Sequence, residues 1–297
     1  MLPEDTISVI MGIKYCRPEL DTLRRSLDSI LAQTYAEFEL LICERGSSHL
    51  AKELLADYAS RDPRVRVIDG SGAGSFSEQL NICLGQSRGA WIARMDDDDY
   101  SEPERFEKQL AYLRTHGGTA FVGCNVRLIQ DGGDVGAQCF PENPQVRDFL
   151  FSMPFIHPAL IFRREALEAA GGYSTLPRCD RCEDYDLLLR LYEMGYSGAN
   201  MQEFLFRYSL PHNGISTRTL RDRTNEVRTR WARFSALGLL PKALPYALKP
   251  WACGWFRGTR SGGSRRSVRR RAEISCEVRN GNSEEDPLLL VRRESAE

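Results

Sequence analysis

The sequence lacks the features that define several large classes of protein. No stretch reaches the roughly 18 consecutive apolar residues of a transmembrane helix, so we expect no membrane-spanning segment. Residues 1–5 contain neither a basic leader nor an apolar run for export, and we expect a cytoplasmic protein. The 40 basic and 41 acidic residues give a net charge of -1, which provides no support for a nucleic-acid partner.

Cysteines are present, but not in the pattern of a disulfide scaffold. The nine cysteines are an odd number and are scattered through apparent core segments, so we expect reduced thiols. Cys179 and Cys182 resemble half of a zinc site. No second close pair supplies the other ligands that a four-coordinate site requires, and zinc is therefore disfavoured.

The chain of 297 residues has room for one large domain with extensions. Its first third alternates short β-branched runs with segments whose apolar residues recur at helical spacing. The predicted strands are 7–11, 38–43, 65–68 and 91–95, and the predicted helices are 20–31, 51–59 and 77–84. This alternation predicts an α/β fold with a mostly parallel sheet, in which ligands bind at the carboxyl ends of the strands.

The rest of the chain changes in character. We predict helices at 107–113, 183–192 and 224–237, strands at 120–129 and 155–162, a hairpin tip at 132–134 and a loop at 208–216. Residues 239–257 mix prolines with aromatic and basic residues, a pattern that fits either a helix docked on the core or a membrane-interface anchor. We therefore divide the chain into a domain at 1–238, an amphiphilic segment at 239–257 and a disordered tail at 258–297.

Four consecutive carboxylates, Asp96, Asp97, Asp98 and Asp99, follow the apolar run at 91–93. A solvated acidic turn is the ordinary explanation for such a cluster. Here a buried strand comes directly before it, which places the charges at the sheet edge where ligands bind. A divalent cation would relieve their mutual repulsion, and hard oxygen ligands suit Mg²⁺ or Mn²⁺.

Five segments, in this order along the chain, resemble family-2 glycosyltransferases. They are residues 7–11, 29–35, 91–99, 103–109 and 183–186. The resemblance extends over most of the chain, and its specificity comes from the combination of motifs. It implies a GT-A fold with a C-terminal helical extension. It also implies an inverting enzyme of the bacterial polysaccharide-biosynthesis type. The membrane helices and the Gln-x-x-Arg-Trp motif of processive synthases are absent, which favours non-processive transfer.

The resemblance implies roles for the acidic cluster. Asp98 corresponds to the carboxylate that binds Mn²⁺ or Mg²⁺, and Asp96 to a ligand of the ribose or of the metal's outer shell. Asp97 and Asp99 belong to the same motif and are expected to contact or orient the donor. As a sugar leaves its nucleoside diphosphate, negative charge grows on the β-phosphate, and a bridging cation stabilises that charge.

The resemblance also implies a general base and two histidine roles. Asp184 corresponds to the base that takes the proton of the acceptor hydroxyl, with Glu183 as a like-charged neighbour that raises its pKa. The alternative is that these two residues only cap a helix. His212 is implied to contact the metal or the diphosphate. His157 is implied to line the acceptor side or to pack in the core.

Two segments depart from the family pattern. Glu44 and Arg45 stand where the family usually has two aspartates, so Glu44 is expected to bind the base or ribose while Arg45 reverses the local charge. The first turn is also unusual, and we expect Met11 near the donor, Lys14 on a phosphate and Tyr15 stacked on the base. A UDP-sugar is the expected donor.

The predicted function is transfer of a single sugar from a nucleoside-diphosphate sugar to a hydroxyl of a glycan or lipid-linked acceptor, in exopolysaccharide, capsule or lipopolysaccharide biosynthesis. Residues 239–271 would make a peripheral contact with anionic lipid at the inner face of the cell membrane. A sugar-nucleotide pyrophosphorylase is one alternative, although the Gly-rich loop that it needs after the first strand is absent. A nucleotide-sugar-binding protein without activity is the other, motivated by Arg45.

Overall fold

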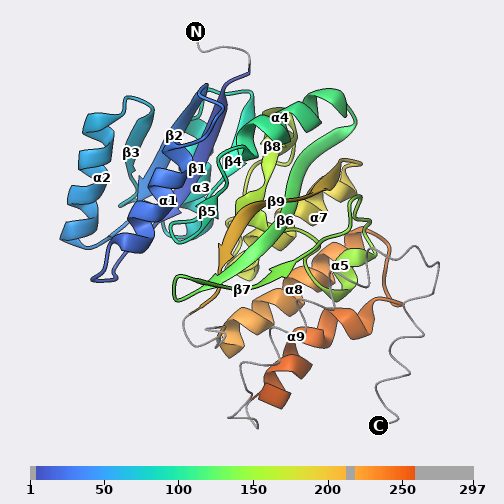
Figure 1. Cartoon of the computed structure of the whole chain (residues 1–297). Helices are drawn as coiled ribbons and strands as arrows, with labels where there is room; N and C mark the ends of the chain where they lie inside the picture. The colour runs from blue at the N-terminus through green and yellow to red at the C-terminus, as the bar shows by residue number, and fades with distance from the viewer. Residues whose placement is uncertain (1–4, 212–217, 258–297) are drawn as a thin grey trace.

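The computed structural model describes residues 5–211 and 218–257 (Figure 1). In this part of the chain the strands form one nine-stranded sheet in the order β3-β2-β1-β4-β8-β6-β9-β5, with β7 paired to β6. The strands are β1 (Ile7–Ile13), β2 (Phe38–Glu44), β3 (Val65–Asp69), β4 (Trp91–Arg94), β5 (Tyr100–Ser101), β6 (Thr119–Gln130), β7 (Gly133–Gln138), β8 (Ile161–Arg163) and β9 (Ser197–Ser209). The helices are α1 (Asp21–Leu31), α2 (His49–Arg61), α3 (Phe76–Gln86), α4 (Arg105–Thr115), α5 (Asp148–Phe151), α6 (Arg164–Ala169), α7 (Glu183–Glu193), α8 (Leu220–Ala236) and α9 (Leu244–Arg257), with 3-10 turns at His157–Ala159 and Pro177–Cys179.

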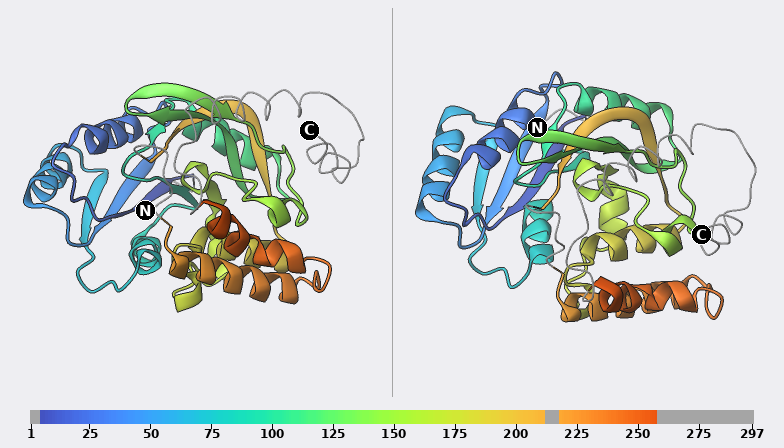
Figure 2. Two further views of the ribbon diagram at one scale, coloured as in Figure 1. Left: turned by 90° about the horizontal axis from the view of Figure 1, so that it is seen from below. Right: turned by 60° about the horizontal axis from the view of Figure 1, so that its bottom comes forward.

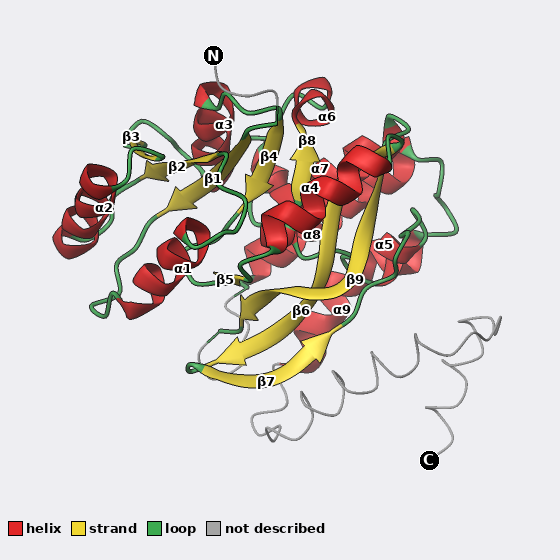
Figure 3. Cartoon of the chain, turned by 45° about the horizontal axis from the view of Figure 1, so that its top comes forward, coloured by secondary structure: helices red, strands yellow, loops and turns green. Residues whose placement is uncertain are grey.

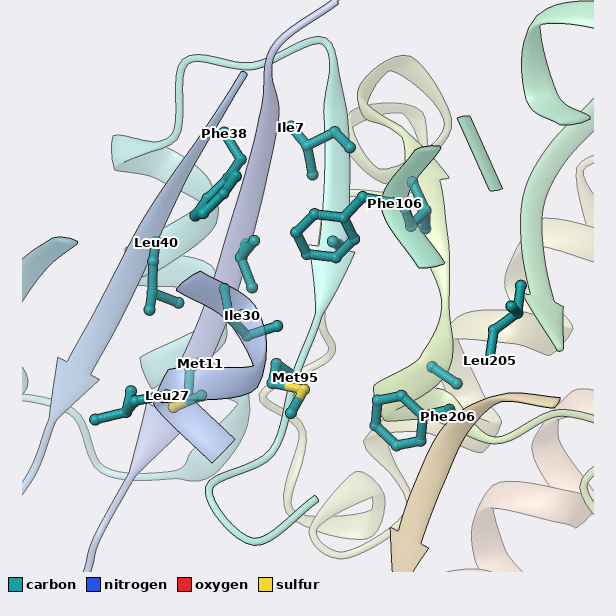
Figure 4. Close-up of a cluster of buried hydrophobic side chains, with 14 of the residues drawn as sticks. Ile7, Met11, Leu27, Ile30, Phe38, Leu40, Met95, Phe106, Leu205 and Phe206 are labelled. Carbon is teal, nitrogen blue, oxygen red and sulfur yellow. The ribbon is translucent and has the colours of Figure 1, made fainter. Parts of the chain in front are cut away.

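Strands β1 to β4 form the parallel half of the sheet, which alternates with helices as predicted. β1 pairs in parallel with both β2 and β4, and β2 pairs in parallel with β3. Successive side chains of a strand point to opposite faces. Ile7 and Met11 therefore join the cluster under α1, whereas Ile10 joins the cluster on the α3 face. Figure 4 shows the first cluster, in which Leu27 and Phe106 pack over the strands.

Side-chain caps fix where three of the helices begin. Ser48 and Ser75 accept hydrogen bonds from backbone amides in the first turns of α2 and α3. Thr219 and Asp222 form a capping box at the start of α8. These contacts satisfy amide groups that have no partner inside the helix. The starting points of α2, α3 and α8 are thus set by local sequence.

The second half of the sheet is mixed. β8 runs antiparallel to β4 and β6, and β9 runs parallel to β6 and antiparallel to β5. β7 is antiparallel to β6 because a tight turn with positive φ at Asp131 and Gly132 joins them directly. The parallel arrangement therefore holds for β1 to β4 and not for the whole sheet. Figure 3 shows the long, curved strands β6 and β9 side by side, with α4 packed against them.

Two local predictions differ from the structure. Residues 155–162 do not form one strand, since His157–Ala159 is a 3-10 turn and only β8 continues as a strand. Pro158 has no amide hydrogen to donate to a neighbouring strand, which explains the break. β9 was not predicted, because polar residues and irregular pairing with β6 interrupt its alternation.

Helices α8 and α9 pack side by side at one edge of the molecule (Figure 2). Ala243 and Ala247 are buried in this contact, and Lys249 Nζ donates a 2.7 Å hydrogen bond to the carbonyl of Phe151. A docked helix, one of the two explanations for residues 239–257, is thus observed, while membrane contact stays a prediction. Within the described residues, no helix is long and apolar enough to cross a bilayer.

The cysteines differ in part from the expectation of reduced thiols. Cys16, Cys43, Cys83, Cys124, Cys179 and Cys182 are free. Cys139 is disulfide-bonded, so the expectation is wrong at that position. Spacing alone does not reveal such pairing, because disulfide connectivity depends on distances in the folded chain. The tail predicted at 258–297 lies outside the described residues.

Candidate active site

The acidic cluster lies at the carboxyl end of β4, between β1 and β8. All four residues of β4 are buried, and the amide of Met95 still bonds to the carbonyl of Ile10. The chain then leaves the sheet. Residues 96–98 are half-buried and Asp99 is buried. The cluster therefore lies at the edge where an α/β sheet binds its ligands, as predicted from the position of the strand.

A buried arginine lies beneath the cluster. Arg94 is 1% exposed, and its guanidinium pairs with the carboxylate of Asp96 and donates a 3.1 Å bond to the carbonyl of Ile10. Burial lowers the pKa of Arg94, but Asp96, Tyr173 and Glu183 raise it to a net value above normal. A charge this deep is tolerated only with such partners. Arg94 thus holds Asp96 at the strand end.

Two arginines near α1 hold Asp98. Arg17 Nη2 lies 3.3 Å from Asp98 Oδ2, and Arg25 Nη2 donates a 2.9 Å bond to the carbonyl of Asp98. The amide of Ser209, at the end of β9, donates a 2.7 Å bond to Asp99 Oδ1. These contacts tie the loop to α1 and β9. The Arg17 side chain is mostly exposed, so its ion pair is weak and leaves the Asp98 carboxylate available to a ligand.

The surroundings of Asp97 and Asp99 disfavour their charged forms. Burial, followed by the charges of Asp98 and Asp96, raises the pKa of Asp97 to about 7. Burial and the same two neighbours also raise the pKa of Asp99. Asp99 Oδ2 is buried without a hydrogen-bond partner among the described residues. Crowded carboxylates of this kind are electrostatically strained, and a nearby cation relieves that strain.

The carboxylates of the cluster fit a hard divalent cation. Their oxygens are the ligands that Mg²⁺ and Mn²⁺ prefer. Between residues 5 and 211 and between 218 and 257, no group of three or more acidic, histidine or cysteine side chains is close enough to hold an ion by itself. The protein would thus supply part of the ligand set, as is usual for Mg²⁺ bound together with substrate phosphates.

The second acidic group begins α7. Burial, followed by the charge of Asp184, raises the pKa of Glu183 to about 7. Burial also raises the pKa of Asp184, whose Oδ1 accepts a 2.7 Å bond from the amide of Tyr185. Cys182 holds the N-cap position without a side-chain capping bond. Carboxyl groups whose pKa lies above the usual range are suited to accept a proton near neutral pH.

The cluster and the start of α7 belong to one polar region. Arg94 lies within the electrostatic reach of both Asp96 and Glu183, which raise its pKa against the effect of burial. Tyr208, on β9, has a pKa raised by burial, then by the carboxylates of the cluster and also by Asp184. Both acidic groups thus lie within electrostatic reach of the same side chains.

A cavity of about 370 Å³ opens beside Asp184. Its wall comes from the start of α7, the end of α5, and from α8 and α9. Asp184 and Tyr185 face it from α7. A molecule in this cavity would lie next to Asp184.

The residues predicted after β1 lie in different environments. Met11 is fully buried under α1, so its side chain does not face a donor in this structure (Figure 4). Lys14 is exposed just beyond β1. Tyr15 is 2% exposed, and its hydroxyl donates a 2.8 Å bond to the carbonyl of Glu19. Stacking of Tyr15 on a base stays a prediction that requires the ring to become accessible.

Glu44 and Arg45, at the end of β2, are both engaged by neighbouring residues. Glu44 Oε1 accepts a 2.5 Å bond from the amide of Ser47, and Oε2 lies 3.5 Å from Lys52 Nζ. Arg45 Nη1 donates a 2.8 Å bond to the carbonyl of Ala73. The Arg45 guanidinium is thus held against the segment between β3 and α3.

Of the two predicted histidines, only His157 lies within the described residues. His157 is 7% exposed, and its Nε2 lies 3.0 Å from the hydroxyl of Tyr173. Burial and then Arg94 hold the pKa of His157 well below its usual range, so the ring is neutral. Of its two predicted places, the core is the one observed. His212 lies outside the described residues.

Sequence reasoning missed two buried arginines, Arg94 and Arg105. Arg105 donates bonds to the carbonyls of Pro158 (3.0 Å) and Arg94 (3.3 Å), and burial lowers its pKa to about 10. For Arg94, the sequence offered one indication, because it is a basic residue inside the apolar run at 91–95. Arginine is rarely buried without a specific partner.

Comparison with known proteins decides the family. A family model described as Glycosyl transferase family 2 matches residues 8–171. The chain belongs to glycosyltransferase family 2. The O-antigen biosynthesis glycosyltransferase WbnJ of Escherichia coli is 35% identical over 217 residues, which cover 70% of this glycosyltransferase and 81% of WbnJ.

Solved structures agree on the fold. Staphylococcus aureus TarS in complex with UDP-GlcNAc matches with a TM-score of 0.64 and 16% identity, over 82% of this chain and 73% of that one. The mannosyltransferase PcManGT from Pyrobaculum calidifontis, in complex with GDP-Man and Mn²⁺, matches with a TM-score of 0.58 and 18% identity, over 86% and 76%. The glycosyltransferase therefore has the predicted GT-A fold, and α8 and α9 follow it as a helical extension.

Proposed function

We propose that this glycosyltransferase is an inverting, metal-dependent enzyme that moves one sugar from a UDP-sugar to a hydroxyl of a glycan or lipid-linked acceptor in bacterial polysaccharide biosynthesis. The observation that carries the proposal is the shared polar region of the β4 cluster and Asp184. The O-antigen role in the name of WbnJ supports the pathway class. The UDP-GlcNAc complex of TarS supports the donor class.

On the donor side, Asp98 and Asp96 would hold Mn²⁺ or Mg²⁺, with His212 as a further ligand. The Mn²⁺ in the PcManGT complex supports a divalent cation. When bound, the cation stabilises charge on the departing diphosphate. Asp97 and Asp99 position the donor, while Glu44 and Lys14 meet its nucleoside and phosphate portions. These assignments rest on the position of the residues at the carboxyl edge of the sheet.

On the acceptor side, Asp184 takes the proton of the attacking hydroxyl. The hydroxyl oxygen forms a bond to the anomeric carbon as the bond from that carbon to the diphosphate oxygen breaks on the opposite face, and the configuration inverts. The raised pKa of Asp184 makes it a better proton acceptor than an ordinary aspartate. Burial is the main cause of that raised pKa, and the charge of Asp184 in turn raises the pKa of Glu183.

The test uses the purified full chain, a panel of nucleoside-diphosphate sugars and Mn²⁺. Asp184→Asn should lower the rate of sugar transfer by about 10²- to 10⁴-fold, because the general base is lost. Its affinity for UDP and Mn²⁺ should stay at the wild-type value. Asp98→Ala should weaken Mn²⁺-dependent UDP binding by about 10-fold or more.

Each of the two variants can contradict the role assigned to its residue. Wild-type transfer by Asp184→Asn would exclude it as the base, and metal-independent UDP binding in Asp98→Ala and wild type alike would exclude the proposed metal role. Asp180→Asn is the matched control, because Asp180 precedes α7 and is exposed. It should transfer sugar at the wild-type rate.

The same assay separates the two other candidate functions. A pyrophosphorylase would form a nucleotide sugar from a sugar phosphate and a nucleoside triphosphate. A binding protein without activity would bind UDP and neither hydrolyse nor transfer the sugar. Arg45, which motivated that second possibility, donates a hydrogen bond to the carbonyl of Ala73.

The domain boundaries at 1–238, 239–257 and 258–297 belong to the same proposal, together with cytoplasmic location and peripheral contact with the inner face of the cell membrane. Deleting residues 239–297 is too drastic a test, because α9 packs on α8. Trp251→Ser is milder, since this side chain is 46% exposed on α9. It should lower recovery with anionic vesicles at low salt, and unchanged recovery would contradict a membrane contact of α9.

A further inference from the structure

The cavity beside Asp184 is rich in positive charge. The charged residues that line it are Arg218, Arg223, Arg230, Lys249, Asp184 and Glu226. Four cationic side chains thus face two acidic ones. The excess comes from α8, α9 and Arg218, which lies two residues before α8. All of these follow residues 8–171 of the family match.

Part of this charge is neutralised inside the wall. Glu226 pairs with Arg218 at 2.8 Å and with Arg230 at 3.0 Å. The Arg230 guanidinium also packs over the ring of Tyr185, 4.6 Å from its centroid. These three charged residues therefore hold one another and stabilise the junction of α7 and α8.

Arg223 and Lys249 are placed differently. Arg223 Nη1 donates a 3.3 Å bond to the carbonyl of Pro250, and Lys249 Nζ donates a 2.7 Å bond to the carbonyl of Phe151. Neither has a carboxylate within ion-pair distance in the part of the chain that the structure describes. Carbonyl groups carry no net charge, so two positive charges face the cavity uncompensated.

Apolar side chains lie beside these charges. Phe151, which lines the cavity, is 43% exposed and makes an edge-to-face contact with Tyr246 of α9. Leu248 and Trp251, on either side of Lys249 and Pro250, are also exposed. The lining of the cavity thus contains apolar side chains, among them Phe151 and Met153, as well as cationic ones. This combination matches a ligand with an anionic group next to a hydrocarbon chain.

We propose that this cavity selects a lipid-linked acceptor through its phosphate, with Arg223 and Lys249 as the specificity-determining residues. The inference rests on the proposed function and specifies its acceptor class. Phosphate oxygens can accept from both cations at once, and such charge-assisted bonds are stronger than neutral ones. The phosphate does not react. It fixes the acceptor so that the sugar hydroxyl reaches Asp184.

Calorimetric titration of the full chain with geranyl diphosphate tests the proposal, with UDP and Mn²⁺ at saturation to fill the donor site. Wild type should bind geranyl diphosphate more tightly than inorganic pyrophosphate and should not bind geraniol measurably. Arg223→Gln combined with Lys249→Gln should weaken geranyl diphosphate binding by about 10-fold or more, because two charge-assisted bonds become neutral ones. UDP affinity should not change.

Several controls keep the test decisive. Glutamine retains an amide that can still donate to the two carbonyls, and thermal unfolding reports whether α9 stays docked. Arg223→Lys, with Lys249 unchanged, should bind geranyl diphosphate nearly as tightly as wild type because it retains the positive charge. Arg228→Gln and Lys242→Gln are matched controls, since both residues are exposed and neither lines the cavity. They should bind like wild type.

Three results would overturn the proposal. These are wild-type affinity in the doubly substituted protein, equal binding of geraniol and geranyl diphosphate, and equal binding of pyrophosphate and geranyl diphosphate, which would indicate a site for free phosphate. A wild-type protein that does not bind UDP would instead contradict the proposed donor, and geranyl diphosphate binding would still report on the cavity.

Discussion

The proposed donor side and the proposed acceptor side of this glycosyltransferase are built in different ways. The donor side is the parallel sheet β1 to β4, in which β1, β2 and β4 are buried along their whole length and the acidic cluster follows the last strand. The acceptor side is helical, and its cavity is walled by α7, α8 and α9, which lie beyond the family match. The proposed reaction chemistry thus belongs to the end of the sheet, whereas the proposed acceptor choice belongs to the helices that follow it.

Arg94 connects the two sides, and its removal has the largest expected effect. Arg94→Met should lower the free energy of unfolding by about 2 to 4 kcal/mol, because buried carbonyls and the Asp96 carboxylate lose their donor. Transfer should fall as well, since Asp96 and Glu183 lose their common counter-charge. Urea denaturation and steady-state kinetics measure both effects.

The control for Arg94 is Arg88→Met, because Arg88 is exposed and only its backbone amide makes hydrogen bonds in the described structure. It should change the free energy of unfolding by about 0.5 kcal/mol or less. If Arg94→Met is as stable and active as Arg88→Met, the two sides do not depend on one buried charge.

Glu183 should make stability depend on pH. Its pKa is about 7 in the folded state against 4.5 for the ordinary group, so the folded protein binds the proton more tightly than the unfolded chain. The free energy of unfolding should therefore fall as pH rises from about 4.5 to about 7, by about 1 to 3 kcal/mol, and then level off.

Glu183→Gln should flatten this pH profile. Urea denaturation at pH values from 5 to 8, in steps of about one unit, measures the profile. Glu165→Gln is the control, because Glu165 is exposed on α6 and should leave the profile as in wild type. A profile equally steep in Glu183→Gln would show that another group on the acceptor side carries the shift.

The smallest expected effect concerns Tyr15 on the donor side. Tyr15→Phe removes the hydroxyl that bonds to the carbonyl of Glu19, which should cost about 0.5 to 1.5 kcal/mol of stability. UDP affinity should not change, because the phenyl ring and its burial are retained. A large loss of UDP affinity would show that the hydroxyl itself contacts the donor.

Sequence patterns located the acidic strand end for a physical reason. The buried run at 91–93 and the acids that follow it set both the strand and its end, and parallel strands bring their carboxyl ends to one edge. The pairing of Asp96 with Arg94 was not predicted. Burial of Met11 and Tyr15 was also missed, because alternation does not indicate how closely α1 covers the first turn.

The acceptor side was less predictable. Asp184 was found through its motif, but the cavity beside it depends on contacts between distant segments, such as Lys249 with Phe151. Residues 239–257 fitted two explanations from the sequence, and the structure shows α9 packed against α8. β9 was missed because its stability comes from pairing with β6 and not from its own alternation.

The sequence by itself determined the alternating fold of the first half, the acidic strand end and the family, because periodicity, capping residues and ordered motifs are local properties. Only the tertiary structure decided that Arg94 lies within electrostatic reach of both the cluster and Glu183, that His157 is a neutral core residue, and that Arg223 and Lys249 line one cavity with Asp184. Such side chains are far apart in the chain. Their charges act on one another only after folding brings them together and removes the water between them.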